Sequence, residues 1–235
     1  MNDFAQSFAT ALDLINADDA VLVHTVALSL GVSGAACLFG AGFGLLGGAW
    51  LAVARFPGHR ALVTLLNTLL ALPSVVVGLV VYLLLSRSGP LGSWGILFTP
   101  SAMVIAQTIL VVPLVAALTR QLVGDSLRDG GDQLRSMGAS AFTCALLMLL
   151  HDRWAVLTVL LTAFGRAIAE VGAVMIVGGN IAGVTRVMTT SIALETSKGD
   201  LALALGIVLL GVVGLLNGLI GLVQWRTGQP QEALA

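Results

Sequence analysis

Long runs of apolar residues alternate with shorter polar segments along most of this chain. A helix needs about 20 mostly apolar residues to cross the hydrocarbon of a bilayer. Five runs reach this length: Val23 to Val53, Leu62 to Leu85, Ser101 to Leu118, Ala155 to Val177 and Leu201 to Val223. The pattern predicts an all-α, polytopic membrane protein with about five transmembrane helices.

Prolines and glycines inside the runs predict details of the helices. Pro73 and Pro113 fall within the second and third runs, where a proline kinks a helix by removing a backbone hydrogen bond. Gly40, Gly44 and Gly48 recur every fourth residue in the first run. Such a face of small residues lets helix backbones approach closely, and we expect it to pack within one bundle.

A polar passage from Arg120 to Trp154 separates the third run from the fourth. Its apolar residues recur at helical spacing among charged ones. The following stretch, Ala141 to Leu150, is apolar but too short to cross a bilayer. We expect short helices under the membrane, broken at Gly130-Gly131 and again near Gly138, that form an exposed elbow.

Composition supports a membrane location. The chain is 57% hydrophobic and 10% charged, with a mean hydropathy of +1.01, whereas soluble domains carry about 25% charged residues. The net charge of -1 argues against a nucleic-acid partner, which would need a concentrated basic surface. No Lys or Arg precedes Arg55, so the basic region of a cleaved secretory signal is not expected.

Basic residues predict the orientation, because they collect on the cytoplasmic side of membrane proteins. One side of the five spans carries seven: Arg55, Arg60, Arg120, Arg128, Arg135, Arg153 and Arg226. The other carries three: Arg87, Arg186 and Lys198. We therefore expect residues 1–22 to lie outside the cell, and the polar passage and a tail of residues 227–235 to lie in the cytoplasm.

No residue pattern predicts a metal or catalytic site. The histidines fall on different sides of the membrane, and Cys37 and Cys144 lack partner spacing. No pair of His, Asp or Glu converges at catalytic spacing in the spans, which argues against an intramembrane enzyme. The chain also lacks a Gly-x-x-x-x-Gly-Lys-Ser/Thr phosphate loop. We expect no cofactor on this chain and no ATP hydrolysis by it.

Arg166 and Glu170 stand four residues apart in the fourth run. Charged groups inside a bilayer are rare and usually mark a pathway or an internal pair. Two interpretations remain open: the pair gates a translocation path, or the two side chains only neutralise each other.

The run Gly178-Gly179-Asn180 predicts a helix stop, followed by a semi-apolar segment from Ile181 to Leu194. We expect this segment to be re-entrant or to lie on the surface at the outer mouth. Candidates there for transient contact with an anion are Asn180, Thr185, Arg186, Thr189 and Thr190. Alternatively, the arginine reaches lipid headgroups and the threonines hydrogen-bond backbone carbonyls.

The polar passage resembles the cytoplasmic loop of ABC importer permeases, whose motif is Glu-Ala-Ala, three residues, Gly, nine residues, Ile, one residue, Leu-Pro. Anchoring the motif on Gly138 aligns its other positions with Asp132, Gln133, Leu134, Met148, Leu150 and His151. Gly138 and Leu150 match, and Asp132 and Met148 are conservative. Gln133, Leu134 and His151 depart from the motif.

The arrangement of spans around this loop also resembles the small five-helix permeases of type I ABC importers, over about Val23 to Arg226. The resemblance implies a permease domain at residues 23–226 of a bacterial plasma-membrane protein. It further implies a homodimer, an extracytoplasmic solute-binding protein, and a cytoplasmic ATPase that uses ATP and Mg. The ATPase would dock on the elbow, which comprises residues 132–140 and includes Ala139 and Ser140.

The stretch Ala163 to Asp200 resembles the permeases of tungstate importers. Molybdate-type chains usually show Gly-Glu-Phe-Gly-Ala where this chain has Ala-Glu-Val-Gly-Ala at residues 169–173, and Leu194-Glu195-Thr196 followed by Lys198-Gly199-Asp200 favours the tungstate branch. The resemblance implies tungstate import, with molybdate or sulfate as the alternative. A secondary transporter with Glu170 as proton carrier is a rival, although the five spans show no inverted repeat.

Overall fold

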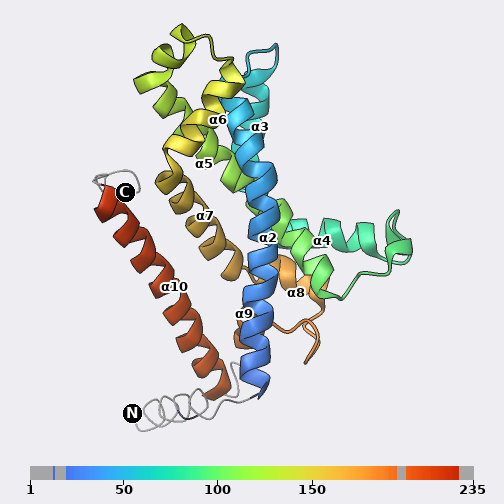
Figure 1. Ribbon diagram of the computed structural model, residues 1–235. Coiled ribbons are helices and arrows are strands. Elements are labelled where there is room, and N and C mark those ends of the chain that lie inside the picture. The colour runs from blue at the N-terminus through green and yellow to red at the C-terminus, as the bar shows by residue number, and fades with distance from the viewer. Residues whose placement is uncertain (1–12, 14–19, 195–199, 228–235) are drawn as a thin grey trace. The chain divides into compact units, whose positions relative to one another are not determined.

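The structure is a computed structural model that describes Asp13, residues 20–194 and residues 200–227 (Figure 1). Its elements are α2 (Ala20–Val53), α3 (His59–Leu70), α4 (Ser74–Leu85), η1 (Gly92–Trp94), α5 (Pro100–Ser136), α6 (Ala141–His151), α7 (Arg153–Ile168), α8 (Gly172–Gly178), α9 (Met188–Leu194) and α10 (Asp200–Thr227). These described residues contain no β-strand. The predicted all-α fold is confirmed.

Three stretches are each long and apolar enough to cross a membrane: α2, α5 and Ala202–Leu222 within α10. Two further pairs pass the same test only together, namely α3 with α4, bent by 98°, and α6 with α7, bent by 79°. The described residues therefore provide up to five spans if each bent pair counts as one. This number agrees with the prediction, but the boundaries differ.

The predicted second span is a corner rather than one kinked helix. Helix α3 ends at Leu70 and α4 begins at Ser74, with Pro73 as its N-cap in an extended conformation at φ -62° and ψ 125°. A proline disfavours the helical conformation of the residue before it, so the chain turns there. Pro113, in contrast, lies inside α5, which continues through it.

The predicted fourth span, Ala155 to Val177, is also divided. Helix α7 ends at Ile168 and α8 begins at Gly172, so residues 169–171 form a joint between two helices. The sequence does not reveal this break, because Ala169 and Val171 are apolar and fit the hydrophobic run on both sides.

The chain forms two compact units. Unit 1 comprises Met1–Ala36, Pro73–Gln107 and Gly165–Leu216, and unit 2 comprises Cys37–Leu72, Thr108–Phe164 and Asn217–Ala235. A core of unit 1 contains Val32, Met103, Val174 and Val187, and α4 packs against α8 in the same unit. Two cores of unit 2 are built from Ala49, Val123 and Ala145, and from Leu51, Leu66 and Ala116.

The predicted glycine face packs within unit 2. A Cβ placed on Gly44 would lie 2.6 Å from Val115 Cβ, and one on Gly48 would lie 2.5 Å from the backbone oxygen of Ala116. Both distances are below van der Waals contact. The glycines therefore let α2 approach the backbone of α5, as expected for small residues at a helix interface.

Candidate functional site

Helix α5 runs without interruption through the first half of the polar passage, to Ser136. The predicted break at Gly130-Gly131 is wrong, because both glycines lie inside α5. A glycine costs a helix only about 1 kcal/mol. Packing offsets this cost: Val123 and Leu127 of α5 share a cluster with Ala145 of α6, and Gly130 lies against the end of the Met148 side chain.

The predicted break near Gly138 is confirmed, and its geometry explains why glycine stands there. Gly138 has φ 86°, in the left-handed region that side chains rarely adopt. Its N–H donates to Arg135 O at 2.9 Å, and the N–H of Ala139 donates to Leu134 O at 3.2 Å. These two bonds form a Schellman motif, which satisfies the last carbonyls of α5.

Helix α6 begins directly after this turn, with Ser140 as its N-cap. Ser140 Oγ accepts a hydrogen bond from the backbone N–H of Thr143 at 3.2 Å and lies 2.7 Å from its hydroxyl. A serine cap satisfies one of the otherwise unpaired N–H groups of a helix start. The elbow therefore has a capped helix end on each side of a three-residue turn, residues 137–139.

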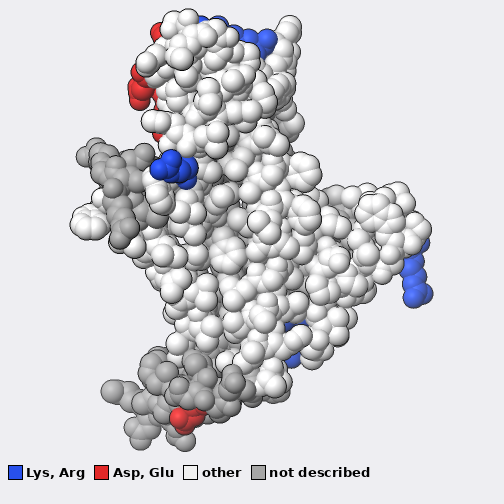
Figure 2. Space-filling model, in the orientation of Figure 1, with Lys and Arg blue, Asp and Glu red and all other residues white. Residues whose placement is uncertain are grey.

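The elbow is exposed. The Asp132 side chain is 99% exposed and pairs with Arg135 at 3.3 Å, and Met137 is 77% exposed. Gln133 and Ser140 are also exposed, whereas Leu134 and Ala139 are half-buried. Figure 2 shows acidic and basic side chains gathered at the end of the molecule where α5 and α6 meet.

The remaining motif positions lie on α6 and divide between core and surface. Met148 is buried against α5, whereas Leu150 and His151 are exposed. The importer motif has a proline where His151 stands. Helix α6 nevertheless ends at His151, so the chain turns at this position without the proline.

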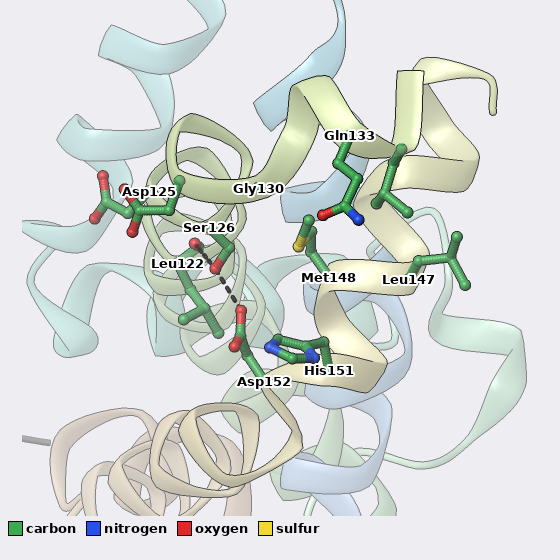
Figure 3. A pocket seen from close by; sticks show the side chains of 11 residues that line it. Leu122, Asp125, Ser126, Gly130, Gln133, Leu147, Met148, His151 and Asp152 are labelled. Carbon is green, nitrogen blue, oxygen red and sulfur yellow. Dashed lines mark hydrogen bonds between the residues drawn. The ribbon is translucent and has the colours of Figure 1, made fainter. Parts of the chain in front are cut away.

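A hollow of about 610 Å³ lies between the end of α5 and α6 in unit 2 (Figure 3). Its polar lining includes Asp125, Asp129, Asp152, Gln133 and His151. Ser126 of α5 donates a hydrogen bond to Asp152, the residue between α6 and α7. This bond ties the α6–α7 bend to α5. Sequence reasoning missed it, because the two residues lie 26 positions apart.

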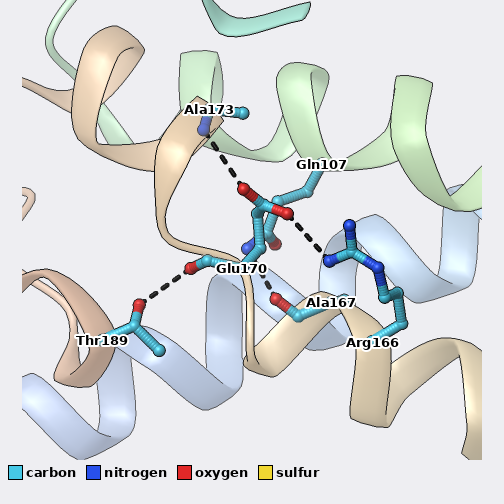
Figure 4. A network of polar contacts seen from close by, with 6 residues as sticks. All are labelled: Gln107, Arg166, Ala167, Glu170, Ala173 and Thr189. Carbon is cyan, nitrogen blue, oxygen red and sulfur yellow. Dashed lines mark hydrogen bonds and ion pairs between the residues drawn. The ribbon is translucent and has the colours of Figure 1, made fainter. Parts of the chain in front are cut away.

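The predicted pair of Arg166 and Glu170 is present, although the two residues do not share one helix (Figure 4). Arg166 Nη1 donates to Glu170 Oε2 at 2.8 Å, and the side chains are 51% and 3% exposed, respectively. Glu170 lies in the joint after α7. Its Oε1 accepts from the backbone N–H of Ala173 at 3.2 Å, in the first turn of α8. A carboxylate there also interacts favourably with the helix dipole.

Two further side chains donate to backbone carbonyls, one at the end of α7 and one in the joint. Gln107 of α5 donates through Nε2 to Ala167 O at 3.0 Å, and Thr189 of α9 donates to Glu170 O at 2.8 Å. Backbone groups freed by a broken helix must find such partners at membrane depth. Gln107 was not among the predicted site residues, since nothing in the local sequence distinguishes it.

The predicted helix stop at Gly178-Gly179-Asn180 is confirmed. Helix α8 ends at Gly178, and Gly179 and Asn180 adopt positive φ angles of 70° and 51°. In the segment that follows, Thr185 Oγ1 donates to Gly178 O at 2.6 Å. Thr190 Oγ1 likewise donates to Val187 O at 3.1 Å.

These bonds agree with the alternative that the threonines hydrogen-bond the backbone. Thr185, Thr189 and Thr190 are buried, whereas Asn180 and Arg186 are half-buried. Contact of this segment with an oxyanion stays a prediction. Glu195 and Lys198, which the tungstate resemblance also used, lie outside the described residues. Within the described part of the chain, no group of three or more His, Cys, Asp or Glu could hold a metal ion.

Comparison with known proteins finds ABC transporter permeases. A probable anion ABC transporter permease protein of Haloferax volcanii is 42% identical over 205 residues, which cover 84% of this chain and 88% of that protein. The tungstate uptake system permease protein TupB of Peptoclostridium acidaminophilum is 39% identical over 226 residues, covering 94% and 97%. The sulfate transport system permease protein CysW of Escherichia coli is 32% identical, covering 95% and 80%. No family model matches the chain.

Proposed function

The chain belongs to the family of oxyanion permeases of ABC transporters, and on this premise we propose that it moves tungstate into the cell. It is a multi-pass membrane protein and a translocation subunit, not an enzyme. Permeases of ABC transport systems work with an ATPase subunit and a solute-binding protein. How these partners engage this chain is part of the proposal.

Tungstate is the proposed substrate because a tungstate uptake permease aligns with nearly the whole chain, at higher identity than the sulfate permease of Escherichia coli. Sulfate or molybdate is the alternative. Moving one charge across 100 mV costs about 2.3 kcal/mol, so a dianion entering a negative interior costs about twice that. ATP hydrolysis by the partner subunit, with its Mg, would supply this energy.

The observation that carries the proposal is the geometry of the elbow. It is exposed, capped on both sides, and directly attached to α5, which is one helix from Pro100 to Ser136. A capped turn on an unbroken helix can transmit a movement of a bound partner to the helix, whereas a flexible linker would not. We propose that the ATPase binds the elbow and the exposed end of α6, and that its closure on ATP moves α5.

The proposed path involves the α7–α8 joint and the segment after it. A bond between Arg166 and Glu170 that forms in one state and opens in another would gate the path. Asn180, Thr185, Arg186, Thr189 and Thr190 would contact the passing oxyanion. In this structure three of these hydroxyls are engaged with the backbone, so contact with the anion would require them to exchange partners.

Charge distribution supports the proposed orientation, with the N-terminus outside and the C-terminus in the cytoplasm of a bacterial cell. Residues 1–22 would then face the binding protein, residues 23–226 would form the permease domain and residues 227–235 a cytoplasmic tail. We further propose a homodimer, because one bundle of about five helices provides a thin wall for a gated passage.

A proton-coupled carrier that uses Glu170 is disfavoured by the contacts of that residue. Its carboxylate is paired with Arg166 and caps α8. Protonating it would remove the charge that strengthens both interactions, whereas a carrier group must exchange its proton easily.

Reconstitution into proteoliposomes with the ATPase and the binding protein tests the proposal. We expect tungstate accumulation, measured by elemental mass spectrometry, that requires ATP and persists when a protonophore dissipates the proton gradient. The matched control is the same complex with an ATPase unable to hydrolyse ATP. Uptake that follows the proton gradient and ignores ATP would contradict the proposal. Calorimetry of the binding protein with tungstate, molybdate and sulfate would then identify the substrate.

A further inference from the structure

A small polar cavity lies beside the α7–α8 joint in unit 1. Ser29, Ser33, Gln107, Glu170 and Thr189 contribute its polar lining. The apolar part of its wall comes from Val32, Ile168 and Val187. Its volume of about 10 Å³ is close to the space that one water molecule needs.

Gln107 presents an unpaired acceptor to this cavity. The residue is only 4% exposed, and its Nε2 donates to Ala167 O (Figure 4). A carbonyl can only accept, so this bond fixes the orientation of the amide. Gln107 Oε1 is then buried and receives no hydrogen bond from the described residues. Buried acceptors in proteins almost always have a partner, because an unpaired one is strongly unfavourable.

We propose that the cavity binds one ordered water molecule, which donates a hydrogen bond to Gln107 Oε1. The second proton of the water has two possible acceptors at the cavity wall, a carboxylate oxygen of Glu170 and the hydroxyl of Thr189. Thr189 has already given its own proton to Glu170 O, so it is free to accept. The hydroxyl of Ser33 can donate to the water, which gives the two to four partners of a typical buried water.

Charge and size favour water over a cation. Arg166 already balances the charge of Glu170, and the cavity has no room for a cation with part of its hydration shell. The water would complete the hydrogen bonding of the joint, together with Gln107 and Thr189. Because water exchanges partners readily, it would also let the joint bend without leaving buried groups unpaired. This inference does not depend on the transported substrate or on ATP.

X-ray hydroxyl-radical footprinting tests the site, because radicals formed from a bound water label the side chains next to it. The full chain in lipid nanodiscs would be irradiated and analysed by mass spectrometry. Val32, Ile168 and Val187 line the cavity and are almost fully buried. Val174 and Val177 of α8 are also almost fully buried, at 1% and 0% exposed, and do not line it, so they are the controls. We expect labelling of the first group well above that of the second.

Gln107→Leu removes the acceptor and should abolish the labelling of Ile168 and Val187. Gln121→Leu, at an exposed position of the same helix, should leave it unchanged. Equal labelling of cavity and control residues in the wild-type chain would overturn the inference, even if Gln107→Leu failed to fold. Labelling that survives in folded Gln107→Leu would also overturn the inference. So would labelling that disappears when sodium replaces choline as the buffer cation, because a cation rather than water would then occupy the cavity.

Discussion

Substitution of Gly138 tests whether the elbow must keep its observed shape. At φ 86° an L-residue costs about 1–2 kcal/mol. No heavy atom lies within 4 Å of a Cβ placed on Gly138, so the added Cβ meets no clash and the cost of alanine there comes from the backbone. If the turn relaxes instead, it loses two hydrogen bonds worth about 0.5–1.5 kcal/mol each.

A cost of about 1–2 kcal/mol changes an equilibrium by a factor of about 5–30. We therefore expect the ratio of tungstate uptake to ATP hydrolysis in proteoliposomes to fall by about this factor in Gly138→Val. Gly138→Ala should lower it less, and Gly138→Asn least, because asparagine tolerates positive φ best among these residues. The assay measures both rates on the same vesicles at equal protein content.

The control is Gly124→Ala, at an interior position of α5 where an added Cβ also meets no neighbour within 4 Å. It should leave the ratio unchanged, because alanine suits an ordinary helical position. Normal coupled uptake in Gly138→Val would refute the proposal that the elbow transmits the movement of the ATPase to α5, and the elbow would be a linker. An equal loss in Gly124→Ala would point to general destabilisation of α5.

Three further predictions concern packing and the proposed path. Gly48→Ala should lower the free energy of unfolding by about 1–3 kcal/mol through overpacking against Ala116. Gly47→Ala, whose Cβ meets nothing within 4 Å, should raise it by up to about 1 kcal/mol. Equal shifts of the two variants in thermal unfolding would contradict the packing role of the glycine face. Glu170→Gln keeps the size of the side chain but removes its charge, and should change both basal ATPase rate and uptake; if neither changes, the pair is not a gate. Arg186→Ala should lower uptake, and full uptake at saturating binding protein would exclude Arg186 from the path.

The sequence predicted the membrane-spanning helices well where one apolar run corresponds to one unbroken helix. The apolar runs located α2, α5 and α10. The runs at Leu62 to Leu85 and Ala155 to Val177 were predicted as single spans and proved to be divided. Hydropathy could not show these divisions, since an apolar corner and an apolar helix have the same average.

The elbow contains one glycine position that the sequence predicted correctly, and just before the elbow lie two that it predicted wrongly. The stop at Gly138 was predictable, because a positive φ favours glycine and needs no distant partner. The expected break at Gly130-Gly131 did not occur, since the same residue type was tolerated where α6 packs against α5. A glycine permits a break, but tertiary packing determines whether the helix uses it.

The helical class, the membrane location, the turn at Gly138 and the resemblance to ABC permeases follow from the order of residues alone, because hydropathy and backbone preference are properties of continuous segments of the chain. The partners of buried polar groups were decided only by the tertiary structure. Gln107 reaches Ala167 across 60 positions, and Thr189 reaches Glu170 across 19. A buried amide or hydroxyl must find a partner in three dimensions, and local sequence does not specify which distant backbone group folding will place beside it.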